Sequence, residues 1–149
     1  AGRLLAGGAA PNANDASSPG ASLDRLRLVH VTRERNAAFV EPRTRQPMPA
    51  AFVWERVAGA VLESRGQPGE VLEVGLAVDF PQAGYRIAWR GAARADGDGV
   101  ARLRCPYATR ALNGDGEALS ARWRMGAAEG RVEIDALDVI AGATVPLER

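Results

Sequence analysis

Apolar and polar residues alternate along several segments in the second half of the chain, and this alternation limits the fold more than any other feature. Within residues 70–80, apolar side chains occupy every second position from Leu72 to Phe80. Successive side chains of a β-strand point to opposite faces, so this segment is predicted to be a strand with one buried face. Similar alternation, or a short apolar run that also predicts a strand, recurs over residues 85–90, 101–105, 119–125, 132–135 and 144–147.

Turn-forming residues separate these segments. Asp-Gly and Asn-Gly steps occur in residues 96–99 and 113–116, and hairpin turns favour such steps because these residues tolerate a positive φ. A calcium loop would need further oxygen ligands and a terminal Glu at fixed offsets, which neither segment has. The pattern predicts an all-β domain, an antiparallel β-sandwich of roughly seven to nine strands with a coil-rich N-terminal segment.

The first 50 residues are patterned more weakly. Residues 1–22 are predicted to be a linker or the frayed end of an upstream region, and residues 23–149 a single β-sandwich domain. Ser22 is expected to cap a helical turn that leads into a strand. Residues 32–50 carry three prolines and are predicted to form a long surface loop. Because the sequence does not begin with Met, we expect it to be a piece of a longer polypeptide.

Composition excludes several kinds of catalytic site. All 19 basic residues are arginine, so neither a lysine Schiff base nor a phosphate-binding lysine is available. Cys105 and His30 are the only residues of their types, which leaves too few for a disulfide, a His/Cys metal cluster or a conventional histidine-based triad. We expect Cys105 to be a small core residue and His30 to be structural or at the surface.

Three carboxylates, Glu133, Asp135 and Asp138, lie close together in the sequence. On a strand, Glu133 and Asp135 would share the solvent-facing side, which favours an ordinary exposed face. A glycosidase would instead need two carboxylates on opposite sides of a cleft. The sequence therefore predicts no complete catalytic site in this chain.

Arginines alternate with apolar residues on three successive predicted strands. If these strands are neighbours, they form an arginine-rich sheet face that fits anionic lipid headgroups, a diphosphate or the acidic surface of a partner. The alternative is a solvated face whose arginines pair with nearby Asp and Glu. Nucleic acid is a poor fit, because the aromatic residues of these strands are predicted to point inward and the net charge is only +1. The residues of the proposed face are Arg86, Arg90, Arg102, Arg104, Arg122 and Arg124.

Several short motifs follow one another in a specific order, beginning with residues 26–30 (LRLVH) and 52–62 (FVWERVAGAVL). These two segments are similar to the pattern RLVY…vfe.VpGA.i, and their order resembles the C-terminal region of STT3-type oligosaccharyltransferases. The resemblance covers roughly residues 23–147 and continues through GQPGEV at 66–71, DGDG at 96–99, LRCPYAT at 103–109, VEI at 132–134 and DVIAGATV at 138–145. The middle portion is equally similar to carboxypeptidase-regulatory-like and transthyretin-like β-sandwiches.

This resemblance implies a soluble domain of a membrane-bound glycosyltransferase that transfers a glycan from a lipid diphosphate carrier to an asparagine side chain. The family's WWDYG motif is absent, and its DxxK motif is impossible without Lys. No catalytic or acceptor-binding residue therefore carries over, and the domain is expected to be non-catalytic and without a cofactor of its own. The parent enzyme is expected to use a divalent metal, Mg or Mn.

The resemblance also implies a location and partners. The domain is expected on the periplasmic or extracellular face, next to the upstream membrane domain of the same polypeptide. The acceptor protein and lipid headgroups are further candidate partners. The alternatives are a free-standing β-sandwich that binds carbohydrate or protein and, less favoured by the sequence, an independent hydrolase.

The arginine face generates a first prediction. If the three strands form one arginine face, replacing Arg102 and Arg104 with Ser is expected to weaken binding to anionic vesicles or to a partner protein, because two cations leave that face. Vesicle co-sedimentation measures the change, and unchanged binding would remove the interaction hypothesis.

Overall fold

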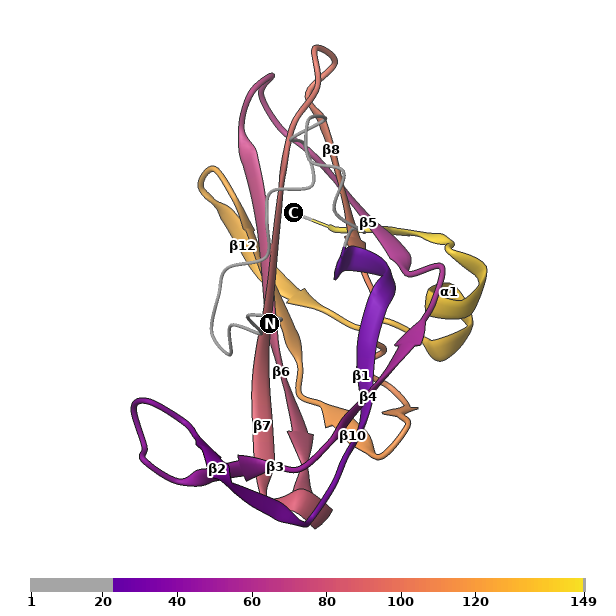
Figure 1. The fold of residues 1–149 in the computed structure, drawn as a ribbon. Coiled ribbons are helices and arrows are strands. Elements are labelled where there is room, and N and C mark those ends of the chain that lie inside the picture. The colour runs from indigo at the N-terminus through magenta and orange to yellow at the C-terminus, as the bar shows by residue number, and fades with distance from the viewer. Residues whose placement is uncertain (1–22, 149) are drawn as a thin grey trace.

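Strands make up most of the described chain. Residues 23–148 are described by the computed structural model (Figure 1), and the predicted linker and the Ser22 cap lie outside this range. The strands are β1 Leu26–Val31, β2 Arg35–Val40, β3 Pro47–Pro49, β4 Phe52–Arg56, β5 Ala60–Arg65, β6 Val71–Phe80, β7 Tyr85–Arg94, β8 Val100–Cys105, β9 Leu112–Asn113, β10 Gly116–Ala118, β11 Ala121–Met125, β12 Ala128–Val132 and β13 Thr144–Pro146. The helices are the 3-10 turns η1 Leu23–Arg25 and η2 Pro81–Ala83 and the α-helix α1 Ala136–Ala141.

The all-β prediction is confirmed, but the predicted number of strands is too low. The described residues form thirteen strands, and four of these, β3, β9, β10 and β13, have only two or three residues. Two or three residues are too few to show an alternating pattern in the sequence. Such strands are recognised only by their pairing with a neighbouring strand. In the part of the chain that the structure describes, no helix is both long and apolar enough to span a bilayer.

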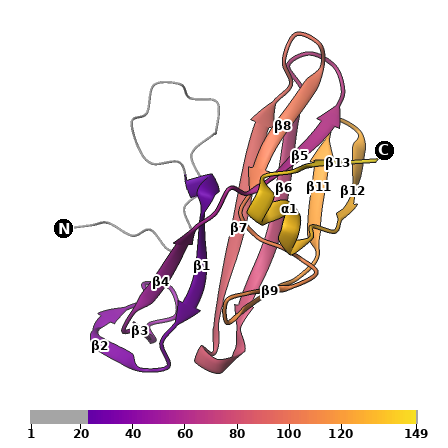
Figure 2. The same cartoon turned by 90° about the vertical axis from the view of Figure 1, so that its right-hand side faces the viewer.

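Two sheets face each other to form the sandwich (Figures 1 and 2). The main sheet has the order β12-β11-β6-β10-β9, with β7 on the other edge of β6. The second sheet has the order β13-β5-β8, and its β13–β5 pair is parallel whereas every other pair is antiparallel. The short helix α1, which the alternation did not predict, precedes β13 and contacts β5.

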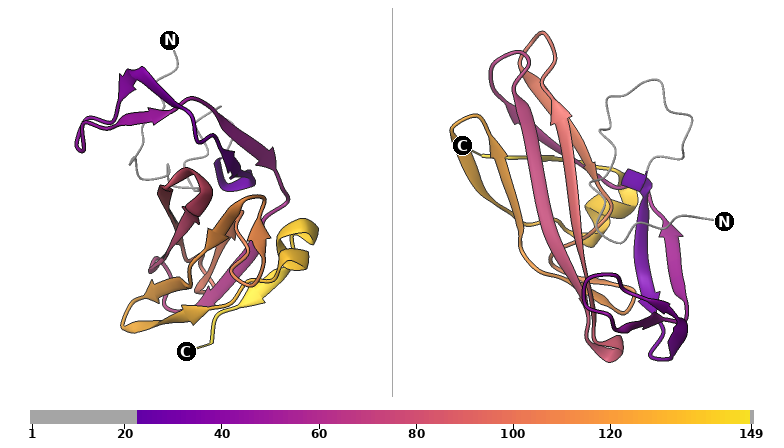
Figure 3. Two further views of the ribbon diagram at one scale, coloured as in Figure 1. Left: turned by 90° about the horizontal axis from the view of Figure 1, so that it is seen from below. Right: turned by 60° about the vertical axis from the view of Figure 1, so that its left-hand side comes forward.

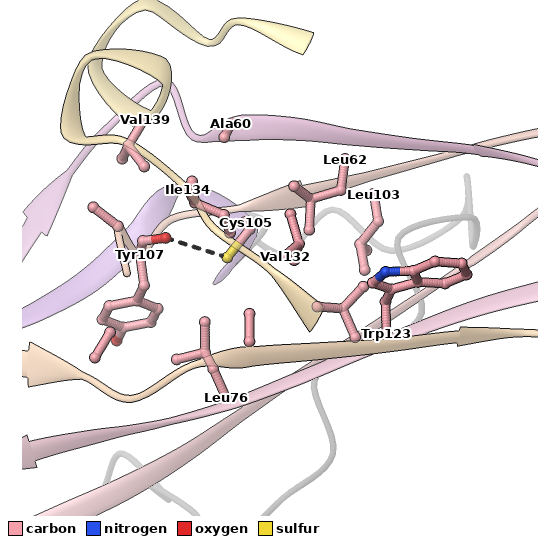
Figure 4. Packing of buried hydrophobic residues seen from close by; sticks show 14 of the residues in the cluster. Ala60, Leu62, Leu76, Leu103, Cys105, Tyr107, Trp123, Val132, Ile134 and Val139 are labelled. Carbon is pink, nitrogen blue, oxygen red and sulfur yellow. Dashed lines mark hydrogen bonds between the residues drawn. The ribbon is translucent and has the colours of Figure 1, made fainter. Parts of the chain in front are cut away.

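The core lies between these sheets. The inward side chains of β6, from Leu72 to Phe80, are all buried, as their alternation predicted. Figure 4 shows Leu62, Leu103 and Cys105 approaching the core from the second sheet, opposite Leu76 and Trp123 of the main sheet. The alternation therefore identifies the central core residues correctly.

Cys105 is a core residue, as predicted. Its side chain is fully buried, and its thiol donates a hydrogen bond to the carbonyl of Tyr107 at 3.6 Å. Burial raises the pKa of the Cys105 thiol to about 12, so it stays protonated at neutral pH. Such a thiol is a poor nucleophile, because the thiolate is the reactive form.

Two details of the predicted strands are wrong. Leu119, expected to point inward, is 41% exposed, because β11 begins only at Ala121. The strand expected over residues 132–135 ends at Val132, and Asp135 is instead the N-cap residue of α1. A helix of six residues is too short to leave a helical period in the sequence.

Residues 26–56 form a bent two-stranded ribbon rather than a strand followed by a long loop. β1 pairs with β4, and β2 pairs with β3. Backbone hydrogen bonds from Thr32 to Ala51, at 3.1 Å, and from Ala50 to Glu34, at 2.8 Å, join the two pairs. The prolines 47 and 49 lie in β3, a short strand that tolerates them.

This ribbon lies beside the sandwich (Figures 2 and 3). It is attached through β1, whose Leu28 amide donates to the hydroxyl of Tyr107 at 2.9 Å. The Asp115 amide also donates to the carbonyl of Val29 at 2.7 Å. These bonds and the fully buried side chain of Leu28 hold the ribbon against the sandwich.

The Asp-Gly segments are turns, as predicted. The Asp96 carboxylate accepts hydrogen bonds from the amides of Asp98, at 3.0 Å, and Val100, at 2.9 Å. These bonds lower the pKa of Asp96. Gly99 has a φ of +76°, and a side chain there would place its Cβ 2.2 Å from the carbonyl oxygen of Gly66.

This turn supplies a matched pair of substitutions. Gly99→Ala is expected to lower the free energy of unfolding by about 2 kcal/mol or more, through left-handed strain and the clash with Gly66. Gly97→Ala is the control, since nothing lies within 4 Å of its added Cβ, and it should change stability by less than about 0.5 kcal/mol. Urea denaturation measures both, and equal stabilities would contradict the described turn.

Candidate functional site

The six predicted arginines do not form one continuous face. Arg86 and Arg90 lie on β7, and Arg122 and Arg124 lie on β11, two strands that flank β6 in the main sheet. The remaining two lie on β8, which pairs with β5 in the second sheet. Because each arginine alternates with an inward residue, the two sheets present their arginines on opposite outer faces of the sandwich. The expectation of a single face is therefore wrong.

Three of the six pair with carboxylates on the neighbouring strand. Arg86 donates to Asp79 at 2.8 Å, Arg102 donates to Glu63 at 2.9 Å, and Arg124 donates to Glu73 at 3.2 Å. Each pair consists of directly opposite residues in the strand register. The hydrogen bond from Arg86 lowers the pKa of Asp79. These three arginines therefore agree with the second interpretation of the sequence, in which exposed arginines pair with nearby Asp and Glu residues on a solvated face.

Arg104 has a structural environment. Its Nη1 donates to the carbonyl oxygens of Ala58, at 2.6 Å, and Gly59, at 3.2 Å, and its Nε lies 3.9 Å from a carboxylate oxygen of Asp24. Gly59 has a φ of +77°, and a Cβ there would lie 2.8 Å from Cγ of Arg104. Arg104 therefore satisfies the carbonyl groups that precede β5 and packs closely on the backbone.

Arg90 and Arg122 differ from the other four. Both are exposed, and neither forms an ion pair or a side-chain hydrogen bond with another residue in the range 23–148. The strand register places both directly opposite Gly75 of β6, one on each side of it. Arg122 also stands opposite Arg131 of β12, which is likewise exposed and unpaired within the described range.

We call Arg90, Arg122 and Arg131 the arginine row. Its members lie on three strands of the main sheet, with Gly75 on the fourth strand between the first two. Directly opposite like charges destabilise a sheet by about 0.2–1 kcal/mol, and no carboxylate of residues 23–148 forms an ion pair with these arginines. The sequence reasoning missed Arg131, although alternation with the inward residue Val132 would have identified it.

The remaining candidate residues do not assemble a catalytic site. Glu133 and Asp135 are exposed, and each lies near the same cation, Arg110, at 3.3 and 3.7 Å. His30 is half-exposed, and its Nδ1 lies 2.5 Å from a carboxylate oxygen of Asp115. Across residues 23–148, no group of three or more His, Cys, Asp and Glu side chains is placed to hold a metal ion.

The fold and the arginine pattern define an all-β sandwich domain with a charged outer sheet face. The sequence profile of the family described as the archaeal glycosylation protein B long peripheral domain matches residues 59–145, more than half of the chain. The chain therefore belongs to this family. The predicted resemblance to the peripheral domain of an STT3-type oligosaccharyltransferase is confirmed. Among curated proteins, no significant match is found.

Solved structures of the Archaeoglobus fulgidus oligosaccharyltransferase have a similar fold. Its complex with Zn and sulfate is 15% identical, with a TM-score of 0.61 over 73% of this chain and 14% of that chain. The AglB complex with an inhibitory peptide and a dolichol-phosphate is 16% identical, with a TM-score of 0.60 over 68% of this chain and 12% of that chain. The chain thus spans about one-seventh of the length of the first of these relatives.

The environment of Arg104 generates a prediction with a matched control. Arg104→Ala is expected to lower the free energy of unfolding by about 2 kcal/mol, because two carbonyl groups lose a charged donor. Arg90→Ala removes an equally charged but unpaired side chain and should change stability by less than about 0.5 kcal/mol. Urea denaturation measures the free energy of unfolding of both variants. A change in Arg104→Ala as small as the change in Arg90→Ala would show that Arg104 has no structural role.

Proposed function

We propose that this chain is a non-catalytic accessory domain of a membrane-bound oligosaccharyltransferase-like enzyme. The parent would transfer a glycan from a lipid diphosphate carrier to protein on the periplasmic or extracellular side. The family match over residues 59–145 carries this proposal. The surroundings of Cys105, Glu133 and Asp135 support the non-catalytic role, since the thiol is buried and protonated and the carboxylates share one arginine.

The ribbon supports a place within a larger polypeptide. Four of its apolar side chains are exposed: Phe39 by 64%, Val40 by 42%, Val53 by 48% and Trp54 by 44%. Their concentration on one projecting element is typical of a surface that another protein region covers. We propose that the upstream membrane domain, or the soluble region next to it, contacts the ribbon, and that the acceptor protein passes nearby.

The divalent metal of the parent is proposed to lie in the rest of the polypeptide. The described residues of this chain do not fit such a site, because their carboxylates, His30 and Cys105 are not grouped to coordinate one ion. Mg²⁺ and Mn²⁺ prefer oxygen ligands. The accessory domain would therefore act by bracing the catalytic region or shaping access for the acceptor.

A free-standing binding module is the second candidate, and the half-exposed Trp54 favours it. An aromatic side chain on an outer strand offers a flat apolar contact with a polar edge, which suits a carbohydrate or protein ligand. Binding of a glycan array by the 149-residue chain, lost in Trp54→Ser, would favour this candidate over the first.

The proposed function predicts how the full gene product behaves. The complete open reading frame should encode many hydrophobic spans and a WWDYG motif, and its membranes should transfer glycan to an acceptor peptide. Removing residues 23–148 should lower the transfer rate without abolishing it, because the catalytic groups lie elsewhere.

The 149-residue chain alone is the control and should transfer nothing. A complete short gene with a signal peptide would contradict the proposal, and so would transfer or hydrolysis catalysed by the isolated chain.

A further inference from the structure

Among the described residues, the arginine row is the part of the main sheet's outer face whose cations have neither an ion pair nor a side-chain hydrogen bond. Two rows are visible in the strand register. In the neighbouring row, Arg124 stands between Glu73 and Glu129, so its charge is compensated. In the arginine row, the corresponding neighbours of Arg122 are Gly75 and Arg131. The contrast between adjacent rows of one sheet shows that the unpaired charges are local rather than a property of the whole face.

Gly75 leaves space between two of the cations. It has no side chain, and adjacent strands lie about 4.8 Å apart, so Arg90 and Arg122 are separated by about 10 Å across it. Arginine side chains span such a distance easily, and their guanidinium groups can turn toward one point above the glycine. A Cβ added at Gly75 would make only ordinary contacts, the nearest at 3.8 Å, so packing does not require glycine here.

The surroundings leave one side of the row open. Along the strands, the next outward residues on that side are Ala77 of β6 and Ala88 of β7, which are directly opposite each other. Three carboxylates also lie near the row, and each is close to another arginine. Glu73 is bound to Arg124, Glu129 stands opposite Arg124, and Glu133, the next outward residue after Arg131, lies 3.3 Å from Arg110. All three arginines of the row are exposed, so their guanidinium groups are accessible to an incoming anion.

We propose that the arginine row binds a phosphate group. A phosphate oxyanion matches the row because arginine presents paired N–H donors to two oxygens at once, and a doubly charged anion can satisfy more than one guanidinium. Bound phosphate would replace the carboxylate that the row lacks and relieve the repulsion between Arg122 and Arg131. A lipid headgroup and a soluble phosphorylated molecule both carry such a phosphate group, and the chemistry of recognition is the same for the two.

The first test uses the 149-residue chain and inorganic phosphate. Titration followed by ¹H–¹⁵N NMR should shift the amides around Gly75, Arg90, Arg122 and Arg131, and the shifts should exceed those caused by sodium chloride of equal ionic strength. Arg122→Ser/Arg131→Ser should weaken phosphate binding by about tenfold or more. Arg86→Ser, a change on the same sheet face outside the row, should leave the affinity within about twofold.

A second pair of variants tests the geometry without removing any arginine. Gly75→Glu places a carboxylate between Arg90 and Arg122 and should abolish phosphate binding while raising Tm. Gly75→Gln has the same shape without the charge and should keep most of the binding. Loss of binding in the glutamate variant alone supports the row as the site.

Vesicles distinguish the two sources of phosphate. Co-sedimentation with phosphatidylcholine vesicles containing about one-fifth phosphatidylglycerol should depend on the row if a headgroup is the ligand. Binding of inorganic phosphate without vesicle binding assigns a soluble phosphorylated ligand instead, and both results support the proposal. Phosphate shifts no larger than those of chloride, or equal affinity in Arg122→Ser/Arg131→Ser and the wild type, would overturn it.

Discussion

The structure depends on β6, because this strand is hydrogen-bonded along both edges and its inward side chains form the middle of the core. β7 pairs with it along its whole length, while β11 and β10 share the other edge. Full burial of a large apolar side chain contributes about 1.5–3 kcal/mol, and five alternate residues from Leu72 to Phe80 are buried. A slip of one residue would turn Glu73 and Asp79 into the core, so burial sets the register of the whole sheet.

That register also decides which outward residues stand opposite each other. It places Asp79 opposite Arg86 and Glu73 opposite Arg124, so these charges are compensated. The same register places Gly75 between Arg90 and Arg122, and within the described part of the chain neither arginine pairs with a carboxylate. The need to bury the apolar side chains of β6 on the inner face of the sheet thus decides which charged residues stand opposite each other on its outer face. In the arginine row, the register required by the core brings like charges together, which is locally unfavourable. Natural proteins tolerate such unfavourable arrangements chiefly at functional sites.

Much of the sandwich was predictable, because burial on one face of a strand leaves a period of two in the sequence. The alternation identified β6, β7, β8 and β11 and placed Cys105 in the core. It failed for the ribbon, because β2 is exposed on both faces and therefore carries no alternation. It also failed for β9 and α1, which are too short to show a period. The Asp-Gly turns were recognised because a positive φ restricts the residue type.

The candidate site shows where sequence reasoning reaches its limit. Alternation alone determined that Arg90, Arg102 and Arg122 point away from the core, since each follows or precedes a buried residue on its strand. Alternation also determined that the chain is an all-β domain, and the composition determined that it has too few His, Cys and Lys residues for several kinds of catalysis. Only the tertiary structure decided which arginines share a face and which of them pair with a carboxylate. It also decided that Arg131 stands opposite Arg122, which in turn stands opposite Gly75. The physical reason is that alternation is a property of one strand, whereas pairing and register arise between strands that are distant in the sequence.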